Sequence, residues 1–258
     1  MSKIYEPRGR AREYSPFALN YFKGCDHGCQ YCYVPRMMKV FSGSYVHENV
    51  SCVNLSGLRK EAARFRASKD GDKQVLLSFT GDPYCKAESG ETWRVLKALL
   101  DNNIHVSILT KNPGKAFRDI DIISGFDHIK IGATLTCYDD AKSREWEPGA
   151  PTSRERIEGL RVFAESGIKT WASLEPVLYP EESLSMIKEV AGFIDHVKIG
   201  KINNHPREHQ IDWEAFLISS VNLCRDLGIK FYIKDDLAKF GSVSMFDGKE
   251  REKDGFNV

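Results

Sequence analysis

The feature that most constrains the fold is a regular alternation of short apolar runs with segments of helical periodicity. The apolar runs are rich in β-branched residues and predict strands at residues 74–80, 105–110, 128–135, 170–178, 196–200 and 230–234. Strands that alternate with helices form a parallel sheet with right-handed crossovers. The number of units favours an α/β fold, a partial (β/α)6-type TIM barrel, over an open doubly wound sheet. The active site of such a barrel lies at the C-terminal ends of its strands.

The segments between the predicted strands carry recognisable helix ends. Thr152 and Glu155 have the spacing of a capping box, and Gly167 stands where a helix commonly ends in a left-handed residue. Similar patterns predict helices at residues 92–100 and 212–227. These helices complete the strand–helix order that a barrel requires.

Two of the predicted strands have similar sequences, FDHIKIG at residues 126–132 and IDHVKIG at residues 194–200. The similarity is either a genuine internal repeat or a coincidence between two strand–helix units. In both strands the branched residues lie on one face and His and Lys on the other. If the apolar face meets the surrounding helices, Lys130 and Lys198 point into the barrel, where a buried ammonium group needs an anionic partner.

Charge and hydropathy exclude several classes of protein. The chain has 258 residues, with 37 Lys and Arg against 36 Asp and Glu. This balance argues against a protein that coats nucleic acid by bulk charge, although it is compatible with a local basic groove. No window approaches the roughly 18 consecutive apolar residues of a membrane-spanning helix, and the start lacks the apolar core of a secretion signal. We therefore expect a cytoplasmic protein with no membrane partner.

The sequence predicts one domain with a short tail. Residues 1–240 are expected to form the barrel, and the polar residues 241–258 a C-terminal extension or a loosely packed lid. The seven cysteines are irregularly spaced, which indicates reduced thiols, some of them metal ligands.

The most informative segment is the loop GCDHGCQYCY at residues 24–33, which spaces Cys25, Cys29 and Cys32 as C-x3-C-x2-C. Three thiolates in one short loop can hold a metal cluster, because bringing them together costs little loop-closure entropy. A structural zinc site needs a fourth ligand and usually takes two separated ligand pairs. His27 is too close in the chain to its neighbours to close a tetrahedron. Zinc binding and accidental clustering remain the alternatives.

With an aromatic residue before its last cysteine and strand–helix units after it, this loop resembles that of the radical S-adenosylmethionine (SAM) superfamily. The resemblance implies a partial barrel of the radical SAM kind and a four-iron four-sulfur (4Fe-4S) cluster held by Cys25, Cys29 and Cys32. One iron is then left open for S-adenosyl-L-methionine. Reductive cleavage of SAM yields methionine and a 5'-deoxyadenosyl radical, which abstracts a hydrogen atom. The cofactors carry this chemistry, and the protein supplies orientation and a dry cavity.

Further motifs narrow the resemblance. NYFKGCDHGCQYCYVP, TGDPYCKAE, LTKNP, EWEPGAPTSRERI and SLEPV, spread over residues 17–200, resemble the spore photoproduct lyase-like branch, often called DNA repair photolyases. One position departs from that branch. In spore photoproduct lyase a cysteine just before the Thr-Ser-Asp turn donates hydrogen to the product radical, and Phe79 aligns with it here. The departure argues against thymine-dimer repair by the lyase's own route.

The resemblance implies SAM-binding roles for residues at several strand ends. Thr80, Gly81 and Asp82 correspond to the polar turn that binds the SAM amino group, where a carboxylate pairs with an ammonium. Lys111 corresponds to a lysine near the SAM carboxylate, and Thr134 to a hydroxyl near the ribose. The alternatives are an ordinary turn residue, a solvated lysine and a core threonine.

The resemblance also implies catalytic residues around the loop. Tyr31 and Tyr33 match aromatic positions beside SAM and the substrate, with packing over the cluster as the alternative. Cys85 is the candidate hydrogen donor, together with Cys137 after another predicted strand, although lone cysteines also serve as small buried hydrophobes.

Glu147 and Arg156 match a Glu-Pro and Arg pair that is typical of the branch. Because they flank a capped helix start, we expect a structural ion pair rather than direct chemistry.

A nucleic-acid substrate would impose a further requirement. A base must leave the stack to reach a radical formed inside a barrel, so phosphate anchors are needed around the barrel mouth. Solvated helix faces are the alternative reading of basic runs. The candidate anchors are Lys3, Arg8, Arg10, Arg12, Arg36, Lys39, the run 59–73, and the loop 201–209 with His205 and His209.

Three functions are compatible with these observations. The first is a radical SAM lyase or isomerase acting on a nucleic-acid base, either in repair of a thymine-type lesion or in rearrangement of a modified pyrimidine in DNA. Its partners would be DNA or a nucleotide base and a reducing electron donor such as flavodoxin or ferredoxin. The second is a radical SAM enzyme acting on a peptide, protein or small metabolite, although no second cysteine set is present. The third is a non-enzymatic iron–sulfur or zinc protein.

Overall fold

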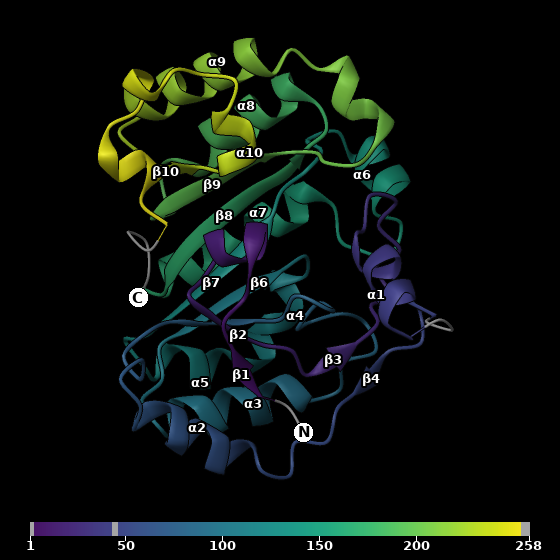
Figure 1. Ribbon diagram of the computed structural model, residues 1–258, viewed down its shortest axis with the longest axis vertical. Coiled ribbons are helices and arrows are strands. Elements are labelled where there is room, and N and C mark those ends of the chain that lie inside the picture. The colour runs from purple at the N-terminus through teal and green to yellow at the C-terminus, as the bar shows by residue number, and fades with distance from the viewer. Residues whose placement is uncertain (1–2, 43–45, 254–258) are drawn as a thin grey trace.

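The computed structural model describes residues 3–42 and 46–253, and its main feature is an eight-stranded sheet (Figure 1). The strand order is β1-β2-β5-β6-β7-β8-β9-β10. From β2 to β10 neighbouring strands are parallel, whereas β1 is antiparallel to β2. The strands are β1 (Ile4–Tyr5), β2 (Phe17–Leu19), β5 (Val75–Leu77), β6 (Val106–Thr110), β7 (Ile129–Thr134), β8 (Lys169–Val177), β9 (His196–Lys201) and β10 (Lys230–Ile233). The sheet is an open barrel with β1 and β10 as its edges, which confirms the predicted α/β class.

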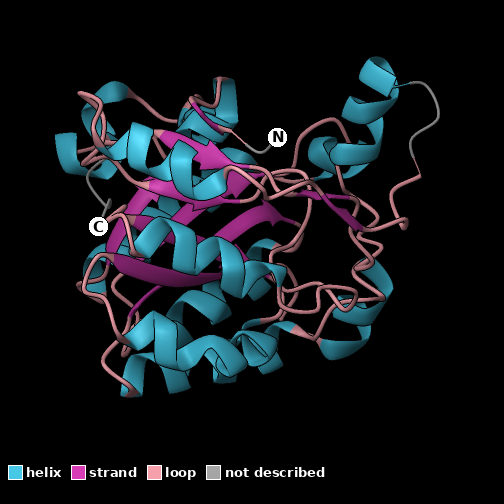
Figure 2. Cartoon of the chain, turned by 90° about the horizontal axis from the view of Figure 1, so that it is seen from below, coloured by secondary structure: helices cyan, strands magenta, loops and turns pink. Residues whose placement is uncertain are grey.

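Helices cover the outer side of the curved sheet, and α1 stands away from the barrel wall (Figure 2). A two-stranded sheet of β3 (Phe22–Lys23) and β4 (Ser51–Cys52) lies beside it. The helices are α1 (Val34–Ser42), α2 (Leu58–Arg66), α3 (Glu91–Leu100), α4 (Pro113–Ala116), α5 (Ile120–Ser124), α6 (Asp140–Trp146), α7 (Ser153–Glu165), α8 (Pro180–Val190), α9 (Trp213–Asp226) and α10 (Asp235–Ala238). Short 3-10 segments lie at Gly9–Glu13, Phe117–Asp119, Pro206–Gln210, Val243–Met245 and Gly248–Arg251.

The predicted helix ends are those of the structure. Thr152 and Glu155 form both hydrogen bonds of a capping box at the start of α7. Gly167 follows α7 with a φ of +76°, which a residue without Cβ adopts at little cost. α3 and α9 begin and end within one residue of the segments predicted at 92–100 and 212–227.

Side chains alternate between two faces along the strands, as the sequence pattern predicts. In β7, Ile129 and Ile131 belong to an apolar cluster beneath α3 and α5, and Ala133 belongs to a second cluster with α7 and α8. Lys130 and Lys198 lie on the other, inner face and are both almost fully buried. The apolar clusters therefore fix the helices outside the sheet and leave polar residues to line the barrel.

The similar sequences of β7 and β9 have a common structural use. A Cβ on Gly132 would collide with the indole ring of Trp171, and a Cβ on Gly200 would lie 2.9 Å from the side chains of Glu175 and Lys234. Each glycine therefore leaves space in the barrel interior for a large side chain of the neighbouring strand β8, Trp171 beside Gly132 and Glu175 beside Gly200. This need for a small residue at equivalent positions of β7 and β9 accounts for the shared glycine.

Lys198 has backbone carbonyl oxygens among its partners. Its Nζ atom donates to the carbonyl oxygen of Glu13 at 2.7 Å and to that of Tyr14 at 3.3 Å. It also lies 5.5 Å from the ring centroid of Tyr232. Carbonyl dipoles and aromatic faces therefore contribute to stabilising this buried ammonium group.

Lys130 gives a prediction about stability and pH. Burial lowers the pKa of Lys130 to about 7, with Asp195 opposing the shift. An unfolded lysine has a pKa of about 10.4, so between these values the unfolded chain binds more protons and folding stability rises with pH. We expect Lys130→Met to raise the free energy of unfolding by about 1–3 kcal/mol at pH 7. The gain should shrink towards pH 10, where the native lysine no longer carries a disfavoured charge.

Thermal unfolding at pH 7 and pH 10 checks this expectation. Lys188→Met, on the exposed side of α8, is the matched control and should change stability little at either pH. A gain from Lys130→Met that is equal at the two pH values would contradict the account.

The C-terminal extension packs against the barrel more closely than a loose lid. Glu250 forms an ion pair with Arg225 of α9 at 2.7 Å and is almost fully buried. Arg251 and Lys253 both form ion pairs with Asp235. The rest of the predicted extension, residues 254–258, lies outside the described residues, as do residues 1–2 of the predicted domain.

None of the helices in the described part of the chain combines the length and the apolar character needed to cross a membrane.

Candidate functional site

The three predicted cluster cysteines lie in one loop between β3 and α1, after the C-terminal end of β2. Gly24 and Gly28 adopt left-handed conformations there, with φ of +85° and +64°. A Cβ on Gly24 would lie 2.5 Å from the carbonyl oxygen of His47. Cys25 N donates to the same oxygen at 2.8 Å. The loop is therefore shaped by close backbone packing that only glycine permits at this point.

The three thiols are at least partly buried, and two cations lie beside the central one. Burial raises the pKa of Cys25 and Cys32, and it raises that of Cys29 to about 11. Cys25 and Cys32 each lie close enough to Cys29 for their charges to interact. Lys111 and Arg156 act in the opposite direction and lower the pKa of Cys29. Metal binding requires thiolates, so two cations beside the central cysteine favour the bound state.

The arrangement fits a cluster better than a single metal ion. Within the described residues, Cys25, Cys29 and Cys32 do not together form a set of ligand atoms that all lie within 4.8 Å of one another. A mononuclear site requires such a compact set, whereas a multi-iron cluster holds its ligands farther apart. The donor set thus agrees with the predicted 4Fe-4S cluster and argues against zinc.

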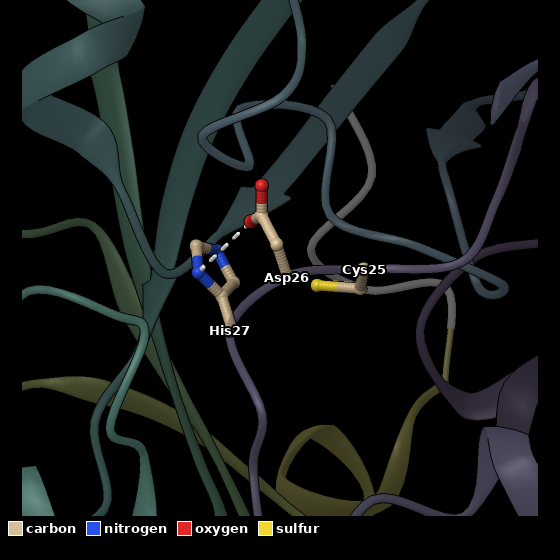
Figure 3. Close-up of side chains that lie close together, drawn as sticks. All are labelled: Cys25, Asp26 and His27. Atoms are coloured by element: carbon tan, nitrogen blue, oxygen red, sulfur yellow. Dashed lines mark ion pairs between the residues drawn. The ribbon is translucent and has the colours of Figure 1, made fainter. Parts of the chain in front are cut away.

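The compact set that does occur joins Cys25, Asp26 and His27 (Figure 3). Its carboxylate and imidazole already have partners in the protein. Asp26 accepts hydrogen bonds from the backbone N–H groups of residues 86 and 87 at 2.9 and 2.7 Å. His27 Nδ1 lies 3.3 Å from the carbonyl oxygen of Gly149. Asp26 and His27 therefore tie the cysteine loop to two other loops.

The predicted SAM-binding turn, Thr80 to Asp82, packs directly on the cysteine loop. The Thr80 hydroxyl donates to the carbonyl oxygen of Phe22 at 2.7 Å. A Cβ on Gly81 would lie 2.5 Å from the carbonyl oxygen of Gly24. The glycine predicted at a binding turn thus has a clear structural reason, since it lets the two loops meet.

Asp82 is buried and has several protein donors. Its Oδ1 accepts from Thr110 at 2.6 Å and from Tyr84 N at 2.8 Å, and its Oδ2 accepts from Lys111 N at 2.6 Å. His27 Nε2 lies 3.3 Å from Oδ2. Burial acts to raise the pKa of Asp82, but His27 and these hydrogen bonds outweigh it and lower the pKa. Asp82 therefore remains ionised and joins the ends of β5 and β6 to the cysteine loop.

Lys111 lies near Cys29 in a group with three other predicted residues, which are Tyr31, Glu147 and Arg156. Its Nζ is 3.8 Å from Glu147 Oε1 and 5.5 Å from the ring centroid of Tyr31. Tyr31 donates to the same carboxylate oxygen. Glu147 also forms an ion pair with Arg156 at 2.5 Å, and both side chains are fully buried. The predicted structural ion pair is thereby confirmed, and through Glu147 it positions both Lys111 and Tyr31 near Cys29.

The remaining predicted residues are more scattered. Tyr33 is half exposed, and its hydroxyl donates to the carbonyl oxygen of Phe79 at 2.8 Å. Thr134 is buried at the end of β7, and its carbonyl oxygen accepts from Arg156. Cys85 and Cys137 are both fully buried. Burial raises the pKa of each of these thiols to about 12, so both stay protonated.

Sequence reasoning missed two side chains that organise the site. Asn20 follows β2, and its Oδ1 accepts a hydrogen bond from Phe79 N at 2.7 Å. This contact holds the chain just after β5, which ends at Leu77 rather than at residue 80 as predicted. His47 Nε2 lies 3.5 Å from Cys32 Sγ. Asn20 stands in the quoted motif NYFKGC, which could have indicated it, but no local pattern points to His47.

Solved structures share this fold. Spore photoproduct lyase complexed with dinucleoside spore photoproduct matches with a TM-score of 0.68, covering 90% of this chain and 78% of that chain at 12% identity. Streptococcus suis SuiB bound to precursor peptide SuiA matches with a TM-score of 0.62, covering 84% of this chain and 48% of that chain at 14% identity. At such identities the likeness establishes the fold alone, a partial β/α barrel.

Sequence comparison establishes the family. An uncharacterized protein of Methanocaldococcus jannaschii, MJ0683, is 30% identical over 168 residues, which are 63% of this chain and 60% of that protein. The chain thus spans about three fifths of that relative's length. The family model described as the radical SAM superfamily matches residues 19–194, well over half of the chain and the whole of the cysteine loop. Members of this family use a 4Fe-4S cluster and SAM, and this chain belongs to the radical SAM superfamily.

Proposed function

We propose that this radical SAM enzyme acts on a base of DNA, as a lyase on a thymine-type lesion or as an isomerase of a modified pyrimidine. The cluster, held by Cys25, Cys29 and Cys32, and bound SAM would supply a 5'-deoxyadenosyl radical that abstracts hydrogen from the substrate. The observation that carries the nucleic-acid assignment is a basic groove on the surface of α2 and α3. The overall likeness to spore photoproduct lyase agrees with it.

The protein's own residues would bind and orient the cofactors. The turn of Thr80, Gly81 and Asp82 and the Thr134 hydroxyl are proposed to hold SAM. The Lys111 ammonium, positioned by buried Glu147, is proposed to pair with the SAM carboxylate. In this arrangement the ion pair of Glu147 and Arg156 fixes the position of the Lys111 ammonium group relative to the cysteine loop.

Three further residues would serve the substrate side. Tyr31 and Tyr33, which flank the last cysteine of the loop, are proposed to cover the cluster and to exclude water from the substrate. Cys85 is retained as a candidate hydrogen donor, and its protonated state agrees with that role. Its full burial means that a movement of the turn after β5 would have to expose it.

The basic groove has a volume of about 900 Å³ and is lined by six cations, namely Lys3, Arg59, Lys60, Arg64, Arg94 and Lys97. Two of these cations form ion pairs with Asp101, and a third pairs with Glu61 at 3.4 Å. Exposed pairs of this kind contribute little energy. Six cations against Asp101, Glu61 and Glu91, whose charge interacts with Arg94, still leave the groove with a net positive charge. A net positive groove attracts the phosphate backbone.

The exposed ring of Trp93 distinguishes the groove from a basic surface that would bind any acidic protein. Its indole ring lines the groove and is 43% exposed. An exposed aromatic ring between cations is the arrangement on which single-stranded bases stack. Lys3 also lines a second pocket, which contains Asn20. Asn20 holds the backbone beside the predicted SAM turn, and we propose that a bound strand passes from the groove over this second pocket towards the site.

Charge reversal tests the groove. We expect the double variant Lys60→Glu and Arg94→Glu to weaken binding of a fluorescein-labelled single-stranded oligonucleotide by about 10-fold or more, and to reduce the salt slope by about two. Trp93→Ala should weaken binding while leaving the salt slope unchanged. Fluorescence anisotropy at several salt concentrations measures both effects, and Lys188→Glu on α8 is the control.

Unchanged oligonucleotide affinity in the double variant would remove the groove from the proposal. A loss confined to reduction by an acidic electron-transfer protein would reassign the groove to the electron donor. Absence of any oligonucleotide binding by the wild type would favour a peptide or metabolite substrate instead.

We also propose a reducing, cytoplasmic setting with flavodoxin or ferredoxin as electron donor. All seven cysteines are free thiols, which agrees with a compartment where disulfides do not form. The proposed catalytic unit is the domain of residues 1–240, with residues 241–258 as its extension.

A further inference from the structure

The inner face of the barrel carries a polar cluster that the site above does not use. Its centre is Glu175, close to the C-terminal end of β8, and it includes Tyr14, Lys234 and Glu13. Gly200 makes room for it, since a Cβ there would lie 2.9 Å from Glu175 Cδ and from Lys234 Cδ. The side chains of Lys234 and Glu13 are almost fully buried, at 2% and 1% exposure. We name this group the Glu175 cluster.

The two carboxylate oxygens of Glu175 have different surroundings. Oε2 accepts a hydrogen bond from the Tyr14 hydroxyl and another from Lys234 Nζ, both at 2.5 Å. Oε1 receives no hydrogen bond from residues 3–42 and 46–253, and it is not among the buried polar atoms that lack a partner. The side chain is 17% exposed. Oε1 is therefore an acceptor that remains open to solvent.

The orientation of this open acceptor is fixed. Burial, followed by the charge of Glu175, raises the pKa of Tyr14 well above its ordinary value. The phenol therefore stays protonated and donates to Oε2 together with the ammonium group of Lys234. Two donors on one oxygen hold the carboxylate plane and leave the other oxygen in one place. A preorganised acceptor of this kind binds a donor with little entropic cost.

Glu175 stands near the C-terminal end of β8, and the cysteine loop follows the C-terminal end of the parallel strand β2, so both lie at the same end of the barrel. Tyr33 donates to the carbonyl oxygen of Phe79, and the ring of Phe79 lies 6.2 Å from that of Tyr14. These contacts join the last cysteine of the loop to the Glu175 cluster. A substrate of the cysteine loop would bind at this same end of the barrel, where Oε1 is an open acceptor.

The charges around Glu175 select the kind of donor. Glu175 and Glu13 carry two negative charges, and both interact with Lys234. Lys198 lies against the backbone of Glu13 at 2.7 Å and supplies a second positive charge. Because the cluster is already balanced, a further cation gains little there. A neutral N–H group can donate to the carboxylate oxygen Oε1 in a charge-assisted hydrogen bond without needing a further counter-charge.

We propose that Glu175 Oε1 is a specificity-determining acceptor for the ring imide N–H of the substrate base, as found in thymine- and uracil-type pyrimidines. This inference rests on the proposed action on a nucleic-acid base and deepens it. In Glu175→Gln, Tyr14 and Lys234 would hold the amide oxygen in the place of Oε2. The amide NH₂ would then stand in the place of Oε1, so a donor would face the imide N–H instead of an acceptor.

The test compares the dinucleotide TpT with its N3-methylated analogue, which lacks the imide hydrogen. Both are titrated calorimetrically into the anaerobically reconstituted, SAM-loaded holoenzyme. We expect the wild type to bind TpT about 10-fold more tightly than the methylated form. Glu175→Gln should reduce this preference to less than about 2-fold, mainly by weakening TpT. Glu181→Gln, an exposed residue of α8, is the matched control and should keep the preference.

A second variant separates hydrogen bonding from steric exclusion of the methyl group. Glu175→Ala removes the acceptor and makes space, so it should also lose the preference. The absorbance of the reconstituted cluster verifies that each variant is folded. If both dinucleotides bind the wild type equally, or Glu175→Gln keeps the wild-type preference, the role of Glu175 is refuted while nucleic-acid binding stands. If neither dinucleotide nor any oligonucleotide binds, the proposed function itself fails and this inference with it.

Discussion

Cys29→Ala is expected to abolish both the brown chromophore of the reconstituted protein and its cleavage of SAM. Cys29 is the central thiol of the loop, near both Cys25 and Cys32, and the charges of Lys111 and Arg156 partly offset the rise in its pKa that burial causes. Removing it leaves two ligands where the cluster needs three. Iron content, the visible spectrum and formation of 5'-deoxyadenosine after reduction measure the effect.

Cys52→Ala serves as the control for Cys29→Ala. Cys52 is a free, partly exposed thiol on β4, outside the loop, so its loss should leave the cluster intact. A Cys29→Ala protein that retained the chromophore and SAM cleavage would remove the loop from the account.

Gly81→Ala is expected to cause the second large loss. The added methyl group would lie 2.5 Å from the carbonyl oxygen of Gly24, so the SAM-binding turn and the cysteine loop must move apart. Forcing apart packed backbone costs about 1–3 kcal/mol, and here the displacement falls on both cofactor sites. We expect reduced iron loading together with SAM binding weakened by about 10-fold or more, since a small misplacement of binding groups is amplified in affinity.

Gly192→Ala is the matched substitution, because a Cβ at that exposed glycine meets nothing within 4 Å. Equilibrium dialysis with labelled SAM and iron analysis of both variants give the comparison. Wild-type SAM affinity and iron content in Gly81→Ala would show that the turn and the loop do not need their present contact.

Local patterns in the sequence were sufficient to predict the main frame of the fold. The capping box of Thr152 and Glu155 depends on residues three positions apart, and the alternation in β7 depends on neighbours two apart. Such short-range rules act before tertiary structure forms. The limits of β2 could not be predicted, because its three residues, Phe17–Leu19, are too few to show a strand periodicity.

The contacts that complete the site are long-range and escaped prediction. His27 and Asp82 are 55 positions apart, and Glu175 meets Tyr14 across 161 positions. The Asp82 carboxylate was predicted as a partner for an ammonium group, but its protein donors depend on how β5 and β6 end side by side. Lys198 likewise depends on a long-range contact, since the fold brings its ammonium group to the carbonyl oxygen of Glu13 across 185 positions. Which groups face each other across a barrel is set by its closure, not by any local pattern.

The most direct test of the central claim is reduction of the reconstituted enzyme with SAM, with and without DNA that carries a thymine lesion or a hypermodified pyrimidine deuterated in the base. The account predicts that one of these DNAs stimulates formation of 5'-deoxyadenosine, and that deuterium passes from the base into 5'-deoxyadenosine or through it into the product. Cleavage of SAM at the same slow rate with every DNA, and without deuterium transfer, would contradict action on a nucleic-acid base.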